Sequence, residues 1–361
     1  IYKSPKELDF IPTVSFFKFF SILLSNGGQL ETQKLIRESD PNKIGLVKVF
    51  IFSWMIHITD IEYAKSFLSE SVHTIPKHEL PPKTPLSIFL GKGISVSNRD
   101  VITISLTLRP DMVAECANEF ITLLNKWTDI PIDVLSLMKR FTAQVLGKLA
   151  FKYDMKQKNE SENTDLLAGI LEYASHEEYN YTNKELRDDL DIQKKAREEV
   201  INVLGSASNL PTSENLKNLK YLTAIIMESL RLYPPAIITS YRKPTKPLNL
   251  SNKITIPKGA NIAVNFWQIH RNPDIWNDAD KFIPERFINP TKETKSSWIP
   301  FSIGPRNCLG QNFSMMGQKV VIALTLLNFE ILLPLNAPHL DEIPLAKTLL
   351  LHPKKIDLIF S

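Results

Sequence analysis

The sequence predicts a mainly helical α+β protein, in which two groups of short strands accompany a larger set of helices. Several segments repeat apolar residues every three and four positions, which is the period of a helix. Two other segments are rich in β-branched and aromatic residues between turn signals, which is typical of strands. The 361 residues include 12 Gly and 24 Pro. So few glycines are unusual for an α/β nucleotide-binding fold, because such folds depend on glycine turns.

The N-terminal part predicts a strand pair followed by a helix. Residues Leu46 to Thr59 are β-branched and aromatic, and Asp60 is a suitable N-cap for a helix that continues to about Leu68. The apolar stretch from Phe10 to Ser25 contains a proline and a lysine. Because it is shorter than the ~20 residues of a membrane span, we expect it to pack in the core, with binding at a membrane surface as the alternative.

The remaining elements are mostly amphipathic helices. They are expected over Asp111–Asn125, Asp133–Phe151, Leu166–Tyr173 and Leu216–Leu232. Pro234 and Pro235 stop the last of these. Short strands are expected between Ile237 and Val264, with a turn at Pro257-Lys258-Gly259. A long apolar helix is expected from Gly317 to Leu333.

Composition excludes several classes of protein. The 43 Lys and Arg against 39 Asp and Glu give a net charge of +4, which is too balanced for a dedicated nucleic-acid binder. The two cysteines, Cys116 and Cys308, lie far apart, so zinc-ribbon and thioredoxin-like motifs are absent. We expect Cys116, on an apolar helix face, to be a core residue.

The chemistry is concentrated in one segment, Phe301-Ser-Ile-Gly304-Pro-Arg306-Asn-Cys308-Leu-Gly310. A thiolate ligand for iron needs a nearby cation and the N-terminus of a helix to hold it deprotonated. Arg306 lies two residues before Cys308, and a helix is expected to follow. Glycines at 304 and 310 permit a tight backbone.

This segment resembles the heme-binding loop of the cytochromes P450, the heme-thiolate monooxygenases, at every fixed position. Glu228-Ser-Leu-Arg231 is similar to the Glu-x-x-Arg of that family, and Pro284-Glu-Arg286-Phe to its Pro-Glu-Arg-Phe. The resemblance implies heme b as the cofactor and Cys308 as its only iron ligand from the chain. It also implies a mainly α (α+β) cytochrome P450 fold over residues 1–361 as a single domain.

The resemblance gives roles to other residues. Arg242 and Arg306 are expected to bind the heme propionates, and Phe301 to pack beside the thiolate. A carboxylate between two guanidiniums can form fork-like bonds with both, so Glu228, Arg231 and Arg286 are expected to form a structural triad that locks the cysteine loop. His270 is expected to be structural.

Two family motifs are missing. No Trp-x-x-x-Arg directly follows Asn98–Val101, and no Ala-Gly-x-Asp/Glu-Thr motif is present. In the family, two segments flank the helix that carries the Ala-Gly-x-Asp/Glu-Thr motif. The similar segments are adjacent in this sequence, so Leu190–Asp191 is interpreted as a deletion seam. The roof of the substrate pocket is also expected to be shortened near 151–163. We therefore interpret the charged run from Lys184 to Glu199 as two joined helix ends, in place of a solvated helix. The single domain is divided into a β-rich part (1–100), a helical part (101–235) and a part with the heme loop and C-terminal helix (236–361).

By resemblance, the expected activity is monooxygenation of a hydrophobic small molecule with O2 and electrons from an NADPH-dependent flavoprotein reductase. The expected location is the cytoplasmic face of the endoplasmic reticulum membrane, through an anchor preceding Ile1, with no transmembrane span in the chain itself. The missing helix carries the family's proton relay. Two alternatives follow from this loss: a heme-thiolate isomerase or dehydratase that needs no O2, and a non-catalytic heme-binding pseudoenzyme.

Overall fold

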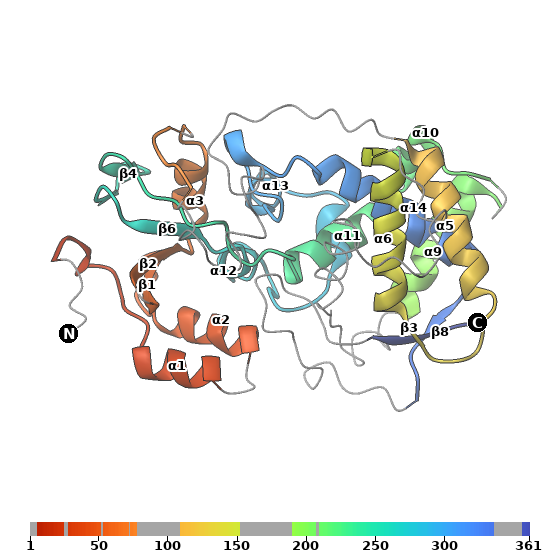
Figure 1. Ribbon diagram of the computed structural model, residues 1–361, viewed down its shortest axis with the longest axis horizontal. Helices are drawn as coiled ribbons and strands as arrows, with labels where there is room; N and C mark the ends of the chain where they lie inside the picture. The colour runs from red at the N-terminus through yellow and green to blue at the C-terminus, as the bar shows by residue number, and fades with distance from the viewer. Residues whose placement is uncertain are drawn as a thin grey trace. The chain divides into compact units, whose positions relative to one another are not determined.

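The computed structural model describes residues 6–24, 28–51, 53–71, 73–77, 109–151, 190–206, 209–335 and 356–361 (Figure 1). The chain forms two compact units. The first comprises Ile1–Ile104, Arg231–Lys281 and Thr291–Cys308, and the second comprises Ser105–Leu230, Phe282–Pro290 and Leu309–Ser361. The expectation of a single domain over 1–361 stays a prediction. Across the described residues, no helix has both the length and the apolar character needed to cross a membrane.

The first unit is built on a three-stranded sheet in the order β1-β2-β6. Strands β1 (Leu46–Ile51) and β2 (Ser53–Ile58) are antiparallel, and β2 runs parallel to β6 (Asn261–Val264). The predicted strand pair is therefore confirmed. Helix α3 (Ile61–Leu68) follows, and Asp60 caps it by accepting a hydrogen bond from the backbone N–H of Tyr63 at 2.9 Å.

The first unit has further elements besides this sheet and α3. They are η1 (Lys6–Leu8), α1 (Phe16–Leu24), α2 (Gly28–Glu38), β4 (Leu248–Leu250), β5 (Ile254–Ile256), α12 (Phe266–His270), α13 (Lys292–Ser297) and η4 (Gly304–Arg306). The apolar N-terminal stretch has one buried side, because Val14 and Phe19 pack in a core cluster that includes Leu35 and Val49. Phe17 in α1 is 84% exposed.

The second unit is a helical layer with a small sheet. Its elements are α5 (Pro110–Leu124), β3 (Ile132–Asp133), α6 (Val134–Phe151), α9 (Leu190–Leu204), α10 (Ser213–Asn218), most of α11 (Lys220–Leu232), η3 (Pro284–Phe287), α14 (Gln311–Asn328), β7 (Ile331–Leu332) and β8 (Asp357–Phe360). Helix α14 packs against α5 and α9 (Figure 1). Its buried face includes Val320 and Leu324. The small sheet has the order β3-β8-β7.

Two predicted helices differ in their bounds. The helix expected from Leu216 to Leu232 is interrupted at Leu219, whose ψ of 73° is not helical. The break is stabilised by Glu199, whose carboxylate accepts hydrogen bonds from the backbone N–H groups of Tyr221 and Leu222 at 2.7 and 2.9 Å. This carboxylate caps α11 from a distant part of the sequence.

The last long helix begins at Gln311 and ends at Asn328, whereas the apolar pattern predicted Gly317 to Leu333. Most residues in the first turns of this helix are half-buried, so these turns lack the strong apolar pattern that predicted the rest of the helix. The apolar residues Ile331 and Leu332 belong to β7, which pairs with β8. The predicted helix at Leu166–Tyr173, the segment after Asn98 and residues 184–189 of the charged run lie outside the described residues. Helix α9 begins at Leu190, so the expected seam falls at its first residue.

Candidate functional site

The cysteine loop is a tightly closed turn in the first unit. The backbone N–H of Cys308 donates to the carbonyl of Phe301 at 2.8 Å, which closes the loop over the short helix η4. Gly304 has a φ of +77°, a left-handed conformation that favours glycine. A Cβ at Gly304 would overlap the carbonyl of Leu68 in α3, so this position needs glycine for a second reason.

The loop places Cys308 in an exposed position. Cys308 is a free cysteine in an exposed position, whereas Cys116 is buried in α5, as expected. Gly310 is the N-cap of α14 with a φ of −84°, a conformation open to any residue. The backbone conformation of the loop therefore favours glycine at Gly304 but not at Gly310.

Two guanidiniums of the first unit lie close to each other beside this loop. Arg242 is 4% exposed, and its main chain pairs with Ile262 of β6. Burial, with the nearby charge of Arg306, lowers the pKa of Arg242 to about 10. Burial also lowers the pKa of Arg306. Neighbouring cations repel, so this arrangement is suited to an anionic group between them.

Glu228 and Arg286 meet in the second unit. The carboxylate of Glu228, in α11, is fully buried. Its Oε1 accepts a hydrogen bond from the backbone N–H of Ile283 at 2.8 Å and another from Arg286 Nε at 3.2 Å. The carboxylate thereby holds the start of η3 against α11. In η3 itself, the neighbouring Glu285 forms an ion pair with Lys195 of α9 at 3.2 Å.

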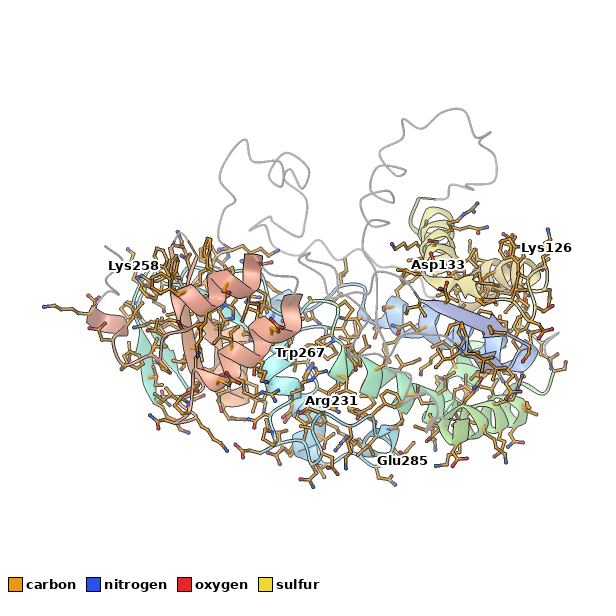
Figure 2. The ribbon with its side chains drawn as sticks, turned by 90° about the horizontal axis from the view of Figure 1, so that it is seen from below. Lys126, Asp133, Arg231, Lys258, Trp267 and Glu285 are labelled. Carbon is orange, nitrogen blue, oxygen red and sulfur yellow. The ribbon has the colours of Figure 1, made fainter. Side chains whose placement is uncertain are left out.

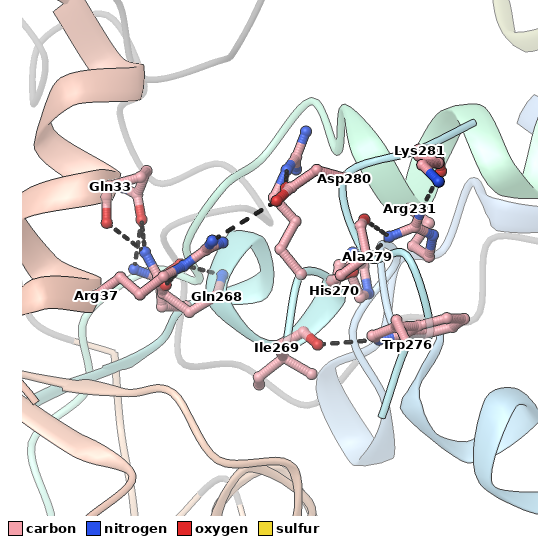
Figure 3. A network of polar contacts seen from close by, with 12 residues as sticks. Gln33, Arg37, Arg231, Gln268, Ile269, His270, Trp276, Ala279, Asp280 and Lys281 are labelled. Atoms are coloured by element: carbon pink, nitrogen blue, oxygen red, sulfur yellow. Dashed lines mark hydrogen bonds and ion pairs between the residues drawn. The ribbon is translucent and has the colours of Figure 1, made fainter. Parts of the chain in front are cut away.

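Arg231, in the last turn of α11 (Figure 2), belongs to the first unit. Its fully buried guanidinium donates from Nη1 to the carbonyls of His270 at 2.7 Å and Ala279 at 2.6 Å, and from Nη2 to the carbonyl of Lys281 at 3.0 Å. The guanidinium also lies over the ring of Trp276, 5.1 Å from its centroid. Figure 3 shows how these contacts gather the chain after α12 around one side chain.

His270 connects this network to the cysteine loop within the same unit. Its Nε2 accepts a hydrogen bond from the backbone N–H of Ile299 at 3.0 Å, two residues before Phe301. Burial, assisted by the charges of Arg231 and Arg271, lowers the pKa of His270 to about 3. The imidazole is therefore neutral and acts as an acceptor, as a structural residue would. Its position as a link could not be seen in the sequence, because Ile299 carries no side-chain signal.

No cluster of three or more metal-ligating His, Cys, Asp or Glu side chains occurs among the described residues. A single cysteine ligand is consistent with this, because a porphyrin supplies four nitrogen ligands of its own. The donor set also fits heme b. The loop offers one exposed cysteine. The same unit holds Arg242 and Arg306, which are both partly desolvated. The buried Nε of Arg242 has no hydrogen-bond partner. Propionate carboxylates are suitable partners for such guanidiniums.

The site therefore defines a candidate heme-thiolate centre, and the comparisons agree. The family profile described as Cytochrome P450 matches residues 180–360. The chain belongs to the cytochrome P450 family, whose cofactor is heme b. The crystal structure of the heme domain of a mutant cytochrome P450DA resembles the fold with a TM-score of 0.79 at 16% identity, covering 97% of each chain. The predicted mainly α (α+β) cytochrome P450 fold is thus confirmed.

Curated relatives resemble one part of the chain. Cytochrome P450 4X1 of Rattus norvegicus is 40% identical over 148 residues, which is 40% of this chain and 29% of that protein. Cytochrome P450 4F5 of Rattus norvegicus is 42% identical over 145 residues, 39% of this chain and 27% of that protein. Taurochenodeoxycholic 6 alpha-hydroxylase of Sus scrofa is 36% identical over 152 residues, 42% of this chain and 29% of that protein. The chain thus matches less than a third of the length of these relatives.

Proposed function

We propose that this chain binds heme b through the thiolate of Cys308 and oxidises a hydrophobic small molecule with O2. The observation that carries the proposal is the closed, glycine-dependent loop that presents Cys308 in the same unit as Arg242 and Arg306. Bound heme would supply the activation of O2, and an anionic sulfur ligand favours O–O cleavage.

The chain's own residues would position and protect this cofactor. Arg242 and Arg306 would bind the propionates by charge-assisted hydrogen bonds. Phe301, whose ring contacts Trp298 at a centroid distance of 6.0 Å, would cover the sulfur and limit water. Glu228, Arg231 and Arg286 have a structural role in this proposal, because Glu228 and Arg231 hold main-chain groups and Arg286 pairs with the buried carboxylate of Glu228.

The partners follow from the family. Electrons would come from an NADPH-dependent flavoprotein reductase, and the substrate would be lipophilic. One curated relative is named Taurochenodeoxycholic 6 alpha-hydroxylase, which supports hydroxylation as the reaction class. Association with the cytoplasmic face of the endoplasmic reticulum membrane belongs to the same proposal.

A non-catalytic heme binder is the second candidate. The observation that favours it is the absence of an Ala-Gly-x-Asp/Glu-Thr motif from the sequence. That motif supplies an acid–alcohol pair for proton delivery, and without it the chain would bind heme with little turnover. A site open to water favours uncoupled consumption of electrons.

One experiment separates the two candidates. The full chain is loaded with heme, combined with a flavoprotein reductase, and supplied with NADPH and a panel of lipophilic substrates. Hydroxylated product that matches NADPH consumption supports the monooxygenase. NADPH consumption that yields peroxide without product overturns it and supports the heme binder. The Cys308→Ala protein, treated identically, gives the background.

A further inference from the structure

Helix α2 covers an ionisable side chain on one face of the sheet of the first unit. Leu35 of α2 packs in one core cluster with Val47 and Val49 of β1. His57 of β2 lies directly opposite Val47 in the antiparallel pair, so its ring is on the side that α2 covers. Its neighbour on the other strand is Ala263 of β6, so neither of these cross-strand neighbours titrates. The ring of His57 is thereby kept from water, and the residue is 6% exposed.

The amide of Asn265, at the N-cap of α12, has a fixed orientation beside this ring. Its Oδ1 accepts the backbone N–H of Gln268 at 3.1 Å, and its Nδ2 donates to Gln33 Oε1 of α2 at 2.9 Å. The same Nδ2 lies 3.5 Å from His57 Nδ1. Because an amide NH2 group only donates, Nδ1 is the acceptor and carries no proton. The proton is therefore on Nε2, which donates to the hydroxyl of Tyr241 at 2.8 Å.

Two main-chain groups prevent this network from reversing its direction. Gln268 Nε2 donates to the backbone carbonyl of Gln33 at 2.7 Å and to Gln33 Oε1 at 3.1 Å (Figure 3). At the other end, the backbone N–H of Gln268 donates to Asn265 Oδ1. A backbone N–H cannot accept, and a carbonyl oxygen cannot donate. Rotating any of the three side-chain amides therefore breaks a hydrogen bond, so the network has one arrangement of its donors.

Charged side chains join this network at its outer end. Arg37 Nε of α2 donates to Gln268 Oε1 at 3.4 Å. Asp280 pairs with Arg37 at 3.9 Å and with Arg271 at 3.2 Å. At the inner end, the titratable group in contact with the ring is the phenol of Tyr241, whose pKa is raised by burial. A neutral phenol supplies no counter-charge to an imidazolium.

A proton on the ring of His57 would disrupt this arrangement. It would place an N–H at Nδ1 against the NH2 group of Asn265, so that two donors face each other. Burial lowers the pKa of His57 to about 4, from an ordinary value of 6.5. The ring therefore binds a proton more readily when it is exposed to water than when α2 covers it. Acid consequently favours any state in which α2 has left this face.

We propose that Gln33, Asn265 and His57 form an acid-operated latch, which holds α2 on the sheet while the ring is neutral and releases it when the ring is protonated. The latch is closed above about pH 6.5 and opens progressively as the pH falls towards 4. It is a conformational device of the first unit that goes beyond the proposed heme-binding function, because it uses none of the residues assigned to the cofactor.

The test measures hydrogen exchange of the backbone amides of α2 in the full chain by mass spectrometry, at pH 7 and pH 5. Rates are corrected for the intrinsic effect of pH, and the backbone amides of α3 serve as the internal reference. The variant His57→Gln keeps a donor and an acceptor but does not titrate. Asn265→Asp puts a carboxylate where the amide donor was. His73→Gln is the matched control, because His73 is exposed.

Protection of the α2 amides in the wild type should fall about twentyfold from pH 7 to pH 5, while α3 keeps its protection. This is the change that linkage gives for a ring with a pKa of about 4 when covered and 6.5 when exposed. His57→Gln should show no such fall, and His73→Gln should show it in full. In Asn265→Asp the fall should be much smaller, because the carboxylate accepts a hydrogen bond from the protonated ring.

Unchanged protection of α2 in the wild type, or an equal fall in His57→Gln, overturns the latch. An equal loss of protection in α2 and α3 means that acid unfolds the whole unit, and it overturns the latch as well. If His57→Gln does not fold, Asn265→Asp decides the question, since a fall as large as that of the wild type would contradict the donor that faces Nδ1. None of these outcomes changes the heme proposal.

Discussion

Arg231 Nη1 donates to the main-chain carbonyl of His270 at 2.7 Å, while the ring of His270 accepts the backbone N–H of Ile299 at 3.0 Å. One residue thereby joins the arginine of the Glu-x-x-Arg motif to the segment that enters the cysteine loop. The arginine of this motif thus acts on the loop of the first unit through backbone carbonyls and an imidazole. This relationship explains why a helix motif and a distant loop motif belong to one site.

Replacing Arg231 should unfold the protein and release heme together. Arg231→Ala leaves three main-chain carbonyls without their guanidinium donor, and disruption of a buried charged network costs on the order of 3–5 kcal/mol. The free energy of unfolding is measured by urea denaturation. Arg140→Ala is the control, because Arg140 is exposed on α6 and its loss should change stability by less than about 0.5 kcal/mol. A folded, heme-loaded Arg231→Ala protein with only slower turnover would contradict the structural role.

Substitutions at Glu228 should separate two of its interactions. Glu228→Gln keeps an oxygen acceptor for the N–H of Ile283 but removes the charge that faces Arg286. Glu228→Ala removes both, and should therefore destabilise the protein more, by a total on the order of 3–5 kcal/mol. Urea denaturation of the two variants gives the comparison. Equal stability of the two would show that the ion pair contributes everything and the backbone bond nothing.

His270 should make the protein sensitive to acid. Its folded pKa of about 3 lies below the ordinary value of 6.5, so the unfolded chain binds a proton that the folded chain does not. Stability from this group is full above pH 6.5 and is lost as pH falls towards 3, by at most about 1.4 kcal/mol per pH unit. His57, whose pKa burial lowers to about 4, adds to the same slope.

The measurement is the free energy of unfolding between pH 7 and pH 5 for the wild type and His270→Gln. The glutamine variant should be less stable at pH 7, because the Ile299 N–H loses its well-placed acceptor. Its stability should also fall less steeply with acid. Identical slopes for the two proteins would show that the imidazole is not buried as described.

Gly304→Ala should be much more damaging than Gly259→Ala. Both glycines have positive φ, +77° and +80°, so both alanines suffer backbone strain of about 1 kcal/mol or more. Only at Gly304 would the new Cβ overlap a backbone atom, the carbonyl of Leu68, while Gly259 has open space. Heme occupancy and urea stability should fall together in Gly304→Ala. Equal effects at the two positions would mean that the loop can move away from α3.

The fold class and many element positions could be predicted because local chemistry determines them. Asp60 stands directly before an amphipathic segment and caps its helix, as its position indicates. The strand pair between Leu46 and Thr59 is likewise set by its own β-branched and aromatic residues. The break at Leu219 could not be predicted, since the carboxylate that caps α11 belongs to Glu199, on another helix.

The motifs of the site could be located from the sequence, but not the contacts that join them. The pattern Glu-x-x-Arg indicates a carboxylate and a guanidinium one turn apart, yet Arg231 binds carbonyls of residues 270, 279 and 281. Backbone carbonyls leave no trace in a sequence.

The most direct test of the account concerns the identity of the iron ligand. The full chain and the Cys308→Ala and Cys116→Ala variants are loaded with heme, reduced and exposed to CO, and the Soret band is recorded. A thiolate ligand from Cys308 should give a strongly red-shifted band in the wild type and in Cys116→Ala, and no such band in Cys308→Ala. A red-shifted band that persists in Cys308→Ala would contradict the heme-thiolate assignment. A heme-loaded wild-type chain that gives no red-shifted band would contradict it as well.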